Sequence, residues 1–252
     1  MHIREIQSKT VLTKTGIGGY DYCINPYVGC QHGCRYCYAS FMKRFTGHSE
    51  PWGKFVDVKI NAPAVLERQS KKLKGSSILI GTVTDPYQPL EKRYLITRRC
   101  LEIICKKPLS LNILTRSPLC LRDLDIFKQS QDIEVGFSIT TDREEIRSIF
   151  EPNAPPIKSR VEALRKIHGA GIKTYVFIGP MLPLNPDSIV RMIAGAADSV
   201  LIDRLNYSGK AWSIYRRFNL EKYMEHDYFY TTALKIREKL GGKDIPASIL
   251  FS

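Results

Sequence analysis

The sequence predicts an α/β protein, a partial (β/α)6 barrel built like a TIM barrel with two units missing. Apolar, β-branched runs alternate with amphipathic segments along most of the chain. Repeats of strand then helix favour parallel strands joined by right-handed crossovers. No low-complexity linker interrupts the repeats, and in such folds the loops that follow the strands carry the chemistry.

Each expected element rests on its own pattern. Short β-branched or aromatic runs predict strands at 20–24, 77–83, 110–115, 133–139, 173–178 and 199–202. Helical periodicity predicts helices over 62–73, 97–105, 119–128, 158–169, 187–197 and, in the tail, 220–240. In the fourth of these, Val161, Leu164 and Ile167 recur every three residues and Gly169 supplies a stop.

Three regions follow from this pattern. Residues 1–19 are expected to be an N-terminal extension, 20–205 the partial barrel, and 206–252 a helical segment that packs on the barrel or closes it. The start of the chain has no apolar run typical of a secretory signal, and no stretch is long and apolar enough for a membrane span. A soluble, cytoplasmic protein without a membrane partner is therefore expected.

The chain is strongly basic, with a formal net charge of +13. Such a field attracts polyanions, and basic pairs recur at 92–93, 98–99, 106–107 and 216–217. A solvated lysine-rich surface and a nucleic-acid partner both explain this composition, because charge alone does not separate them.

Three of the seven cysteines are crowded into one segment, where Cys30, Cys34 and Cys37 read C-x3-C-x2-C between Gly29 and Tyr38. Crowded cysteines in a reducing compartment are more often metal or cluster ligands than disulfide partners. Three thiolates on one tight loop suit three irons of a 4Fe–4S cubane and leave the fourth iron an open coordination position. A zinc site would normally need a second, distant ligand pair, and a ferredoxin-type carrier a fourth local cysteine.

Several motifs resemble the radical S-adenosylmethionine (SAM) superfamily, and in particular its spore photoproduct lyase-like, DNA repair photolyase-related branch. The resemblance spans roughly residues 22–187. It is carried by Asn25-Pro26-Tyr27-x-Gly29-Cys30-x-His32-x-Cys34-x-Tyr36-Cys37-Tyr38-Ala39, Thr84-Asp85-Pro86-Tyr87-Gln88-Pro89-x-Glu91, Leu114-Thr115-Arg116-Ser117, Phe137-Ser138-Ile139, Glu151-Pro152 with Arg160, and Ile178-Gly179-Pro180-x-x-Pro183.

The resemblance implies a 4Fe–4S cluster on Cys30, Cys34 and Cys37, SAM as cosubstrate, and a flavodoxin or ferredoxin as electron donor. It also implies a set of SAM contacts: the backbone of Tyr36, the hydroxyls of Thr84 and Ser138, the guanidinium of Arg116 and the backbone of Gly179, with Arg160 and Glu151 as further candidates. A guanidinium suits the SAM carboxylate because it pairs with carboxylates in bidentate fashion.

One departure concerns the substrate. Spore photoproduct lyase has a cysteine, two residues before the SAM-contacting hydroxyl, that returns a hydrogen atom to the product radical; the equivalent position here is Thr82. A hydroxyl is a poor hydrogen-atom donor, so the chain is not expected to be a true spore photoproduct lyase. Tyr38 and Cys120 are the remaining candidates for a catalytic side chain.

Three functions therefore stay open. The first is hydrogen-atom abstraction by a 5′-deoxyadenosyl radical from a nucleic acid or nucleotide. The second is the same chemistry on a peptide, a protein side chain or a small metabolite. The third is a non-catalytic iron–sulfur or zinc-binding module.

Overall fold

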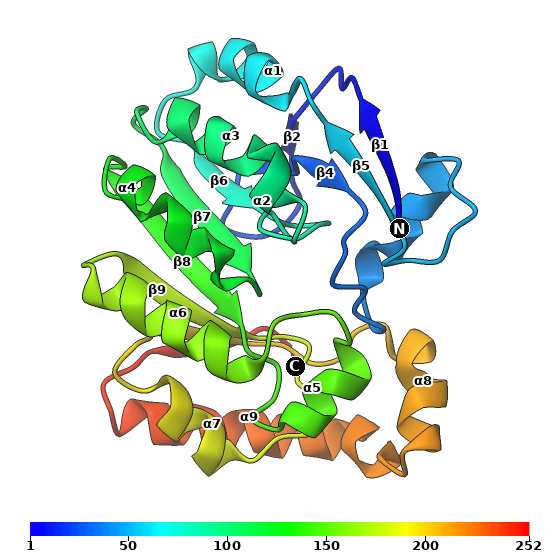
Figure 1. The fold of residues 1–252 in the computed structure, drawn as a ribbon. Helices are drawn as coiled ribbons and strands as arrows, with labels where there is room; N and C mark the ends of the chain where they lie inside the picture. Colours follow the sequence, from blue (N-terminus) through cyan, green and yellow to red (C-terminus); the bar gives the residue numbers. More distant parts are fainter. Residues whose placement is uncertain (252) are drawn as a thin grey trace. The chain divides into compact units, whose positions relative to one another are not determined.

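A computed structural model describes residues 1–251 of the chain (Figure 1). The chain forms two compact units. The first comprises residues 1–33 and 38–135, and the second comprises residues 34–37 and those from 136 onward. The cysteine motif is therefore divided, with Cys30 in the first unit and Cys34 and Cys37 in the second.

The first unit contains a small sheet of β1 (His2–Ile6), β5 (Phe55–Lys59) and β4 (Tyr27–Val28), in the order β1-β5-β4. β1 runs parallel to β5, with His2 opposite Phe55, and β4 runs antiparallel to it. The 3-10 helix η1 (Tyr38–Phe45) follows the cysteine motif and leads through a loop into β5.

The larger sheet of the first unit begins at an edge strand, β2 (Leu12–Lys14), which is antiparallel to β3 (Tyr22–Ile24). β3, β6 (Ser77–Ile80) and β7 (Ser110–Thr115) are parallel neighbours. The connecting helices in this unit are α1 (Ala62–Gln69), η2 (Ser70–Lys72), α2 (Glu91–Tyr94), α3 (Ile96–Ile104), η3 (Pro118–Asp123) and α4 (Leu124–Phe127). α3 shows why such segments are helical, because its apolar stripe of Ile96, Cys100, Leu101 and Ile104 is buried.

The chain passes into the second unit along β8 (Asp132–Ser138). There, β9 (Lys173–Ile178), β10 (Ser199–Ile202) and β11 (Ala247–Ile249) are successive parallel strands. Gly136 on β8 allows a close approach, because a Cβ there would lie 2.1 Å from the ring of Tyr175. The helices of this unit are α5 (Glu144–Phe150), α6 (Ile157–Gly169), α7 (Pro186–Ile193), α8 (Ser208–Arg217), η4 (Glu221–Met224) and α9 (His226–Gly241).

The predicted fold class is confirmed: the protein is α/β, with parallel strands in an open sheet and not in a closed barrel, and β2 and β11 are edge strands. Three elements match the expected bounds, namely β7, β9 and β10. The helix expected at 119–128 is a 3-10 helix followed by the short α4, because Asp123, at their junction, has φ of −103° and ψ of 15° and is not α-helical. The helix expected at 187–197 ends at Ile193, and Gly195 follows it with φ of +76°.

The division into three regions stays a prediction, and the structure describes what those regions contain. Residues 1–19 contribute β1 and β2, which the sequence pattern did not indicate. Residues 206–251 contribute α8, α9 and β11; α9 packs against α7, and β11 extends the sheet of the second unit beside β10. Within residues 1–251, no helix combines the length and apolar character that crossing a bilayer would require.

Candidate functional site

Two tight turns shape the cysteine motif. The amide of Gly33 donates to the carbonyl of Cys30 at 3.2 Å, and that of Cys37 donates to the carbonyl of Cys34 at 3.1 Å. Cys30 and Cys34 are buried, and Cys37 is half-buried. Each turn therefore lies between two cysteines of the motif, and the spacing follows from local backbone hydrogen bonds.

Glycine is required beside these turns. Gly29 has φ of +89°, and a Cβ there would lie 2.4 Å from the carbonyl oxygen of Phe55. Gly33 has φ of +58°, and a Cβ on Gly53 would lie 2.7 Å from the Gly33 Cα. The start of β5 thus lies against the backbone before Cys30, and the loop that precedes β5 lies against the backbone after it.

In the first unit, amide hydrogen bonds hold the segment that carries Cys30. The buried Gln88 accepts from the amide of Gln31 at 2.9 Å and donates to the Thr84 hydroxyl at 3.0 Å. The Thr84 hydroxyl in turn donates to the carbonyl of Gly29 at 2.6 Å. The Gln31 side chain accepts from the amide of Leu90 at 2.6 Å, so the two segments bond to each other in both directions.

Asp85 adds a charged group to this arrangement. Its carboxylate accepts from the Thr115 hydroxyl and the Arg116 amide, both at 2.7 Å, and lies 3.1 Å from Nε2 of the buried His32. Burial alone would raise the pKa of Asp85, but His32 and these hydrogen bonds outweigh burial and lower it to about 2. Asp85 therefore joins the motif, through His32, to the end of β7.

The carboxylates of Glu91 and Asp123 hold the C-terminal part of the Thr84–Glu91 segment. The buried Glu91 accepts from the hydroxyl of Tyr27, from the amide of Thr97 and from Arg122, which lies at 2.8 Å. Asp123 accepts from the hydroxyl of Tyr87 at 3.0 Å. Arg122 keeps 24% of its side chain exposed, so its charge retains contact with water.

In the second unit, a buried ion pair holds the segment that carries Cys34 and Cys37. The Tyr36 hydroxyl donates to Glu151, which also accepts from Thr140 at 3.1 Å and pairs with Arg160 at 2.5 Å. The side chains of Glu151 and Arg160 are both 0% exposed. The amide of Arg35 donates to the carbonyl of Phe150 at 2.9 Å, which adds a backbone bond to the same segment.

Arg160 also fixes the end of β8. Its guanidinium donates to the carbonyl of Ser138 at 3.0 Å and to that of Pro155 at 2.9 Å. Ser138 is 0% exposed, and within residues 1–251 its Oγ has no hydrogen-bond partner. A buried hydroxyl without a partner is costly, so its place at the carboxyl end of a strand suits a polar ligand atom.

The remaining predicted residues have these surroundings. Arg116 is half-buried after β7, and Gly179 is buried after β9, where a Cβ would lie 2.2 Å from the Phe177 ring. The Tyr38 hydroxyl donates to the carbonyl of Thr82 at 2.6 Å, and the Thr82 hydroxyl accepts from Asn25 at 2.8 Å.

Cys120 is fully buried, and its pKa lies well above the ordinary thiol value because of burial and the nearby charges of Asp85 and Asp123. It is therefore a neutral thiol. Burial raises the pKa of Cys105 to about 12. Because the thiolate is the reactive form, Cys105 is a second unreactive thiol.

The donor chemistry of the motif fits an iron–sulfur cluster. Thiolates are the ligands such clusters take, and glycine at positions 29 and 33 leaves the backbone close around the sulfur-bearing segment. The buried Ser138 Oγ, which lacks a hydrogen-bond partner within the described residues, could bond to a bound cosubstrate. The residues present are therefore consistent with the cofactors that the motif predicts.

Sequence reasoning did not assign roles to Gln88, His32 and Thr140. Gln88 and His32 stand inside the quoted motifs, so a signal existed, but their partners at Gln31 and Asp85 come from other segments. Thr140 carries no motif and is found only through Glu151.

Solved structures share this fold. Spore photoproduct lyase complexed with a dinucleoside spore photoproduct matches with a TM-score of 0.73 and 14% identity, over 98% of this chain and 82% of that one. SuiB of Streptococcus suis, bound to S-adenosylmethionine, matches with a TM-score of 0.58 and 14% identity, over 91% of this chain and 50% of that one. At such identities the likeness shows the fold.

Several sequence relatives match most of this chain. An uncharacterized protein of Methanocaldococcus jannaschii is 40% identical over 183 residues, 73% of this chain and 69% of its own length. An uncharacterized protein of Acidianus two-tailed virus is 34% identical over 173 residues, 65% of this chain and 57% of its own length. A radical SAM Nα-GlyT isomerase of Pseudomonas phage M6 is 22% identical over 210 residues, 78% of this chain and 43% of its own length. The chain thus spans little more than half of the viral relative and less than half of the phage enzyme.

The Radical SAM superfamily model matches residues 24–194, which is more than half of the chain. Proteins of this superfamily are enzymes that use a 4Fe–4S cluster and SAM and take electrons from an external donor. With the cysteine motif, the open parallel sheet and the family match in agreement, this chain belongs to the Radical SAM superfamily.

Proposed function

We propose that this chain cleaves SAM reductively, with Cys30, Cys34 and Cys37 as the ligands of its 4Fe–4S cluster. When bound, cluster and SAM together supply one-electron cleavage of the sulfonium, which yields methionine and a 5′-deoxyadenosyl radical for hydrogen-atom abstraction from a substrate. The observation that carries the proposal is the C-x3-C-x2-C segment, which offers three thiols and not four, in a chain of this superfamily. A flavodoxin or ferredoxin is the proposed electron donor.

The proposed SAM contacts are the backbones of Tyr36 and Gly179, the side chain of Arg116, and the hydroxyls of Thr84 and Ser138. Ser138 has the strongest support, because its buried Oγ lacks a partner within the described chain. The Thr84 hydroxyl donates its proton to Gly29 and accepts from Gln88, so one lone pair remains for an ammonium donor.

Glu151 and Arg160 are proposed as positioning residues and not as direct SAM contacts. The two side chains form an ion pair with each other. Their remaining hydrogen bonds are with Tyr36, Thr140 and the carbonyls of Ser138 and Pro155. They thereby hold two of the proposed SAM-contacting segments in place.

Anaerobic reconstitution tests the proposal. After iron and sulfide are supplied, the protein should show thiolate-to-iron charge-transfer absorption, and reduction with dithionite in the presence of SAM should release 5′-deoxyadenosine. Both signals should disappear when Cys30, Cys34 and Cys37 are changed to Ala. Cys23→Ala and Cys105→Ala are matched controls outside the motif that should retain both signals.

A different result would favour a non-catalytic module. Stoichiometric zinc in the purified protein, together with no SAM cleavage after reconstitution, would contradict the proposal. Iron–sulfur absorption without 5′-deoxyadenosine from any electron donor would also contradict it.

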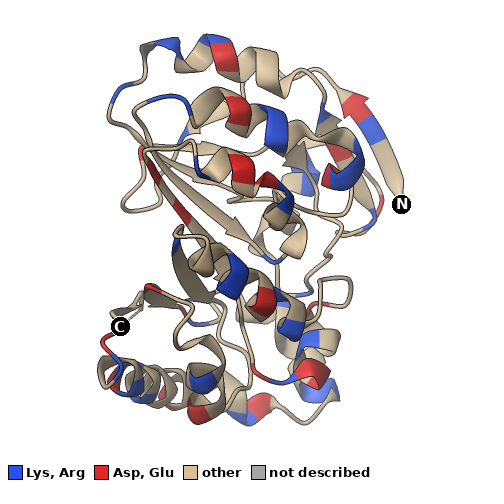
Figure 2. Cartoon of the chain, turned by 60° about the vertical axis from the view of Figure 1, so that its left-hand side comes forward, with Lys and Arg blue, Asp and Glu red and all other residues tan. Residues whose placement is uncertain are grey.

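For the substrate we propose a nucleic acid or nucleotide. Figure 2 shows Lys and Arg interleaved with Asp and Glu on the helices of both units, so charge alone is a weak guide. The segment around α8 is different, because α8 itself contains Lys210, Arg216 and Arg217 and no acidic residue. Exposed aromatic side chains lie within and on both sides of α8: Tyr207, Trp212 and Phe218 are 56%, 49% and 40% exposed.

This combination suits single-stranded nucleic acid. Cations bind the phosphates, and bases stack on aromatic rings without strict sequence preference. Next to the start of α8 is a pocket with a mixed lining, in which the polar side chains of Arg204, Asn206, Ser208 and His226 stand beside the apolar Leu205, Met224 and Phe229. Arg204 lines this pocket, and because a guanidinium pairs with phosphate in bidentate fashion, its position supports a phosphate-bearing ligand.

Salt dependence provides the test. Affinity for a single-stranded oligonucleotide, measured by fluorescence anisotropy, should fall as salt rises. The slope of log K against log salt is negative, and R216A/R217A should reduce its magnitude by about 0.7 for each phosphate that the protein no longer neutralises. The control is K158A/K166A on α6, two exposed lysines that should leave the slope unchanged.

No retention of oligonucleotides at low ionic strength would instead favour a peptide or small metabolite. That alternative has its own support, because SuiB bound to its precursor peptide SuiA shares the fold, with a TM-score of 0.57 and 15% identity over 90% of this chain. Repair of the spore photoproduct is not proposed, because the hydrogen-donor position is Thr82.

A further inference from the structure

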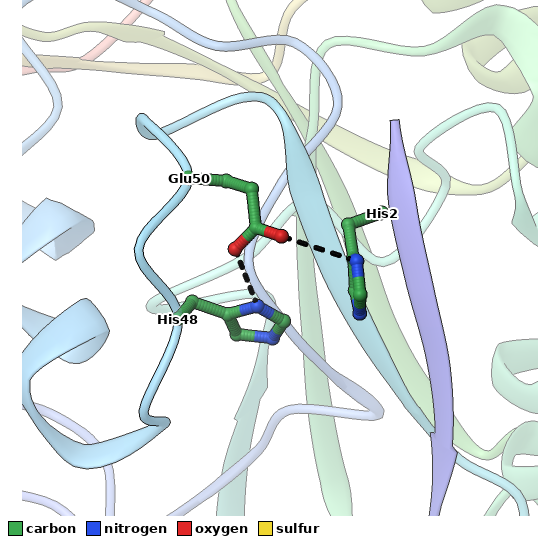
Figure 3. Close-up of side chains that lie close together, drawn as sticks. All are labelled: His2, His48 and Glu50. Atoms are coloured by element: carbon green, nitrogen blue, oxygen red, sulfur yellow. Dashed lines mark hydrogen bonds and ion pairs between the residues drawn. The ribbon is translucent and has the colours of Figure 1, made fainter.

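Outside the cysteine motif, three metal-ligating side chains of the first unit converge (Figure 3). The Glu50 carboxylate lies 3.1 Å from Nδ1 of His2 and 3.0 Å from Nδ1 of His48. One ligand atom from each residue lies within 4.8 Å of the other two. His2 comes from β1, and His48 and Glu50 come from the loop that leads into β5.

A second carboxylate fixes the proton on His48. Asp57 is buried and takes a bidentate pair of hydrogen bonds from Arg4, at 2.8 and 2.9 Å. Nε2 of His48 lies 2.9 Å from the same carboxylate, so Nε2 carries a proton and donates it. In the neutral imidazole, Nδ1 then presents a lone pair toward Glu50.

With a neutral His48, two electron-rich atoms face each other at 3.0 Å, and the same holds for His2 when its Nδ1 is unprotonated. A cation between them turns this repulsion into attraction. The arrangement of a metal-binding imidazole whose other nitrogen donates to a carboxylate is the usual support of histidine ligands in zinc sites.

We infer that His2, His48 and Glu50 form a binding site for a divalent transition-metal cation of the zinc type. Metal bonds of 2.0–2.2 Å in a tetrahedral site separate neighbouring ligand atoms by roughly 3.3 Å. The Nδ1 atoms of His2 and His48 lie at similar distances, 3.1 and 3.0 Å, from the two oxygens of the Glu50 carboxylate. Two imidazoles and one carboxylate are a typical ligand set for zinc and leave a fourth position for water. His2 is 49% exposed at its side chain, so solvent provides an entry path.

This site is physically connected to the loop of Cys30. The His48 ring stacks on Phe55 with a centroid separation of 4.1 Å, and the carbonyl of Phe55 lies against Gly29. Gly53, three residues after Glu50, lies against Gly33. A metal that ties β1 to this loop would brace the backbone on both sides of Cys30. The inference does not depend on the proposed function, because it concerns other ligands.

Cobalt binding to the full, untagged chain tests the site. Cys30, Cys34 and Cys37 are changed to Ala so that the motif does not compete for metal. One Co²⁺ per chain should bind, with visible ligand-field absorption typical of nitrogen and oxygen ligands, without thiolate charge transfer, and Zn²⁺ should displace it. His2→Ala and Glu50→Gln should each weaken binding at least tenfold, and Asp57→Asn by about 10–100-fold.

The matched control is His226→Ala, an exposed histidine whose ring lies 4.0 Å from the Asp227 carboxylate, which should leave Co²⁺ affinity unchanged. Because His2 and Glu50 are not fully buried, their variants are expected to fold, and circular dichroism verifies this. Absence of saturable Co²⁺ and Zn²⁺ binding would overturn the inference and leave a proton-bridged ion pair. Equal affinity in His2→Ala, Glu50→Gln and the unaltered site would overturn it as well.

Discussion

The two halves of the cysteine motif are held by different kinds of interaction. The half with Cys30, in the first unit, depends on neutral hydrogen bonds, because Gln88 accepts from the Gln31 amide and Thr84 donates to the Gly29 carbonyl. The Asp85–His32 contact is its charged element. The half with Cys34 and Cys37, in the second unit, depends on the Glu151–Arg160 pair, which has no exposed surface. Both arrangements hold the segment of the cysteine motif, but the cost of removing one partner differs between them.

The difference lies in what remains after one partner is removed. A neutral amide without its partner is an unsatisfied polar group, which costs about 1–3 kcal/mol. A buried guanidinium without its carboxylate is a bare charge in a medium of low polarity, which costs more. Removing one partner should therefore lower the free energy of unfolding more in the second unit than in the first. The following variants test that ordering.

The largest effect is expected for Glu151→Gln. It strands the charge of the fully buried Arg160 and should lower the free energy of unfolding by about 3–5 kcal/mol, measured by urea denaturation. Glu91→Gln in the first unit is the matched control. Its partner Arg122 is 24% exposed and also pairs with Asp123, so about 2 kcal/mol is expected. Equal losses in the two variants would remove the proposed contrast.

Asp85 should make stability depend on acidity. Its folded pKa of about 2 lies below its ordinary value of 3.8, so the stabilisation is complete above pH 4 and is lost as pH falls toward 2. The shift corresponds to about 2 kcal/mol. Acid titration of unfolding, in a protein with the three motif cysteines changed to Ala so that cluster loss does not contribute, should show this dependence.

Asp85→Asn should abolish that part of the pH profile, whereas the exposed Asp132→Asn should preserve it. A profile that is the same in both variants would show that the carboxylate of Asp85 does not stabilise the first unit through its ionised form.

A smaller effect is expected for Gln88→Ala. It leaves the amide of Gln31 without its acceptor and removes a donor from Thr84 in a fully buried position, so a decrease of about 2 kcal/mol in the free energy of unfolding is expected. The exposed Gln129→Ala should change the free energy of unfolding by less than about 0.5 kcal/mol. A decrease as large as that for Glu151→Gln would reverse the ordering of the two units.

The smallest effect is expected for Thr84→Val, which removes the hydrogen bond to Gly29 and the one from Gln88. It should cost about 1.5 kcal/mol, because the Gln88 amide still donates to the Gly29 carbonyl at 3.4 Å. Thr84→Ser keeps the hydroxyl and should recover most of that stability in the same denaturation experiment. If Thr84 also contacts SAM, the Val variant should weaken SAM binding in equilibrium dialysis and the Ser variant should restore it. Full SAM affinity in Thr84→Val would limit this residue to its structural role.

Local chemistry allowed much of this molecule to be predicted. The strands β7, β9 and β10 were predicted with correct bounds, because each is a short apolar run with clear interruptions on both sides. The ligand motif is equally local, since its three cysteines lie within eight residues and their turns close by bonds between near neighbours. Such features need no knowledge of distant residues.

Tertiary structure alone decided the rest. The pairing of β1 with β5 joins His2 to Phe55, and the bond from Tyr36 to Glu151 spans 115 residues, so neither could be inferred from periodicity. β1 and β2 are short, partly exposed edge strands whose apolar content is too low to indicate a strand. What the sequence by itself determined is the repeating architecture and the spacing of the thiols, because these depend on neighbours along the chain. Which carboxylate holds the motif, and which histidines meet, depends on long-range packing that only the folded chain creates.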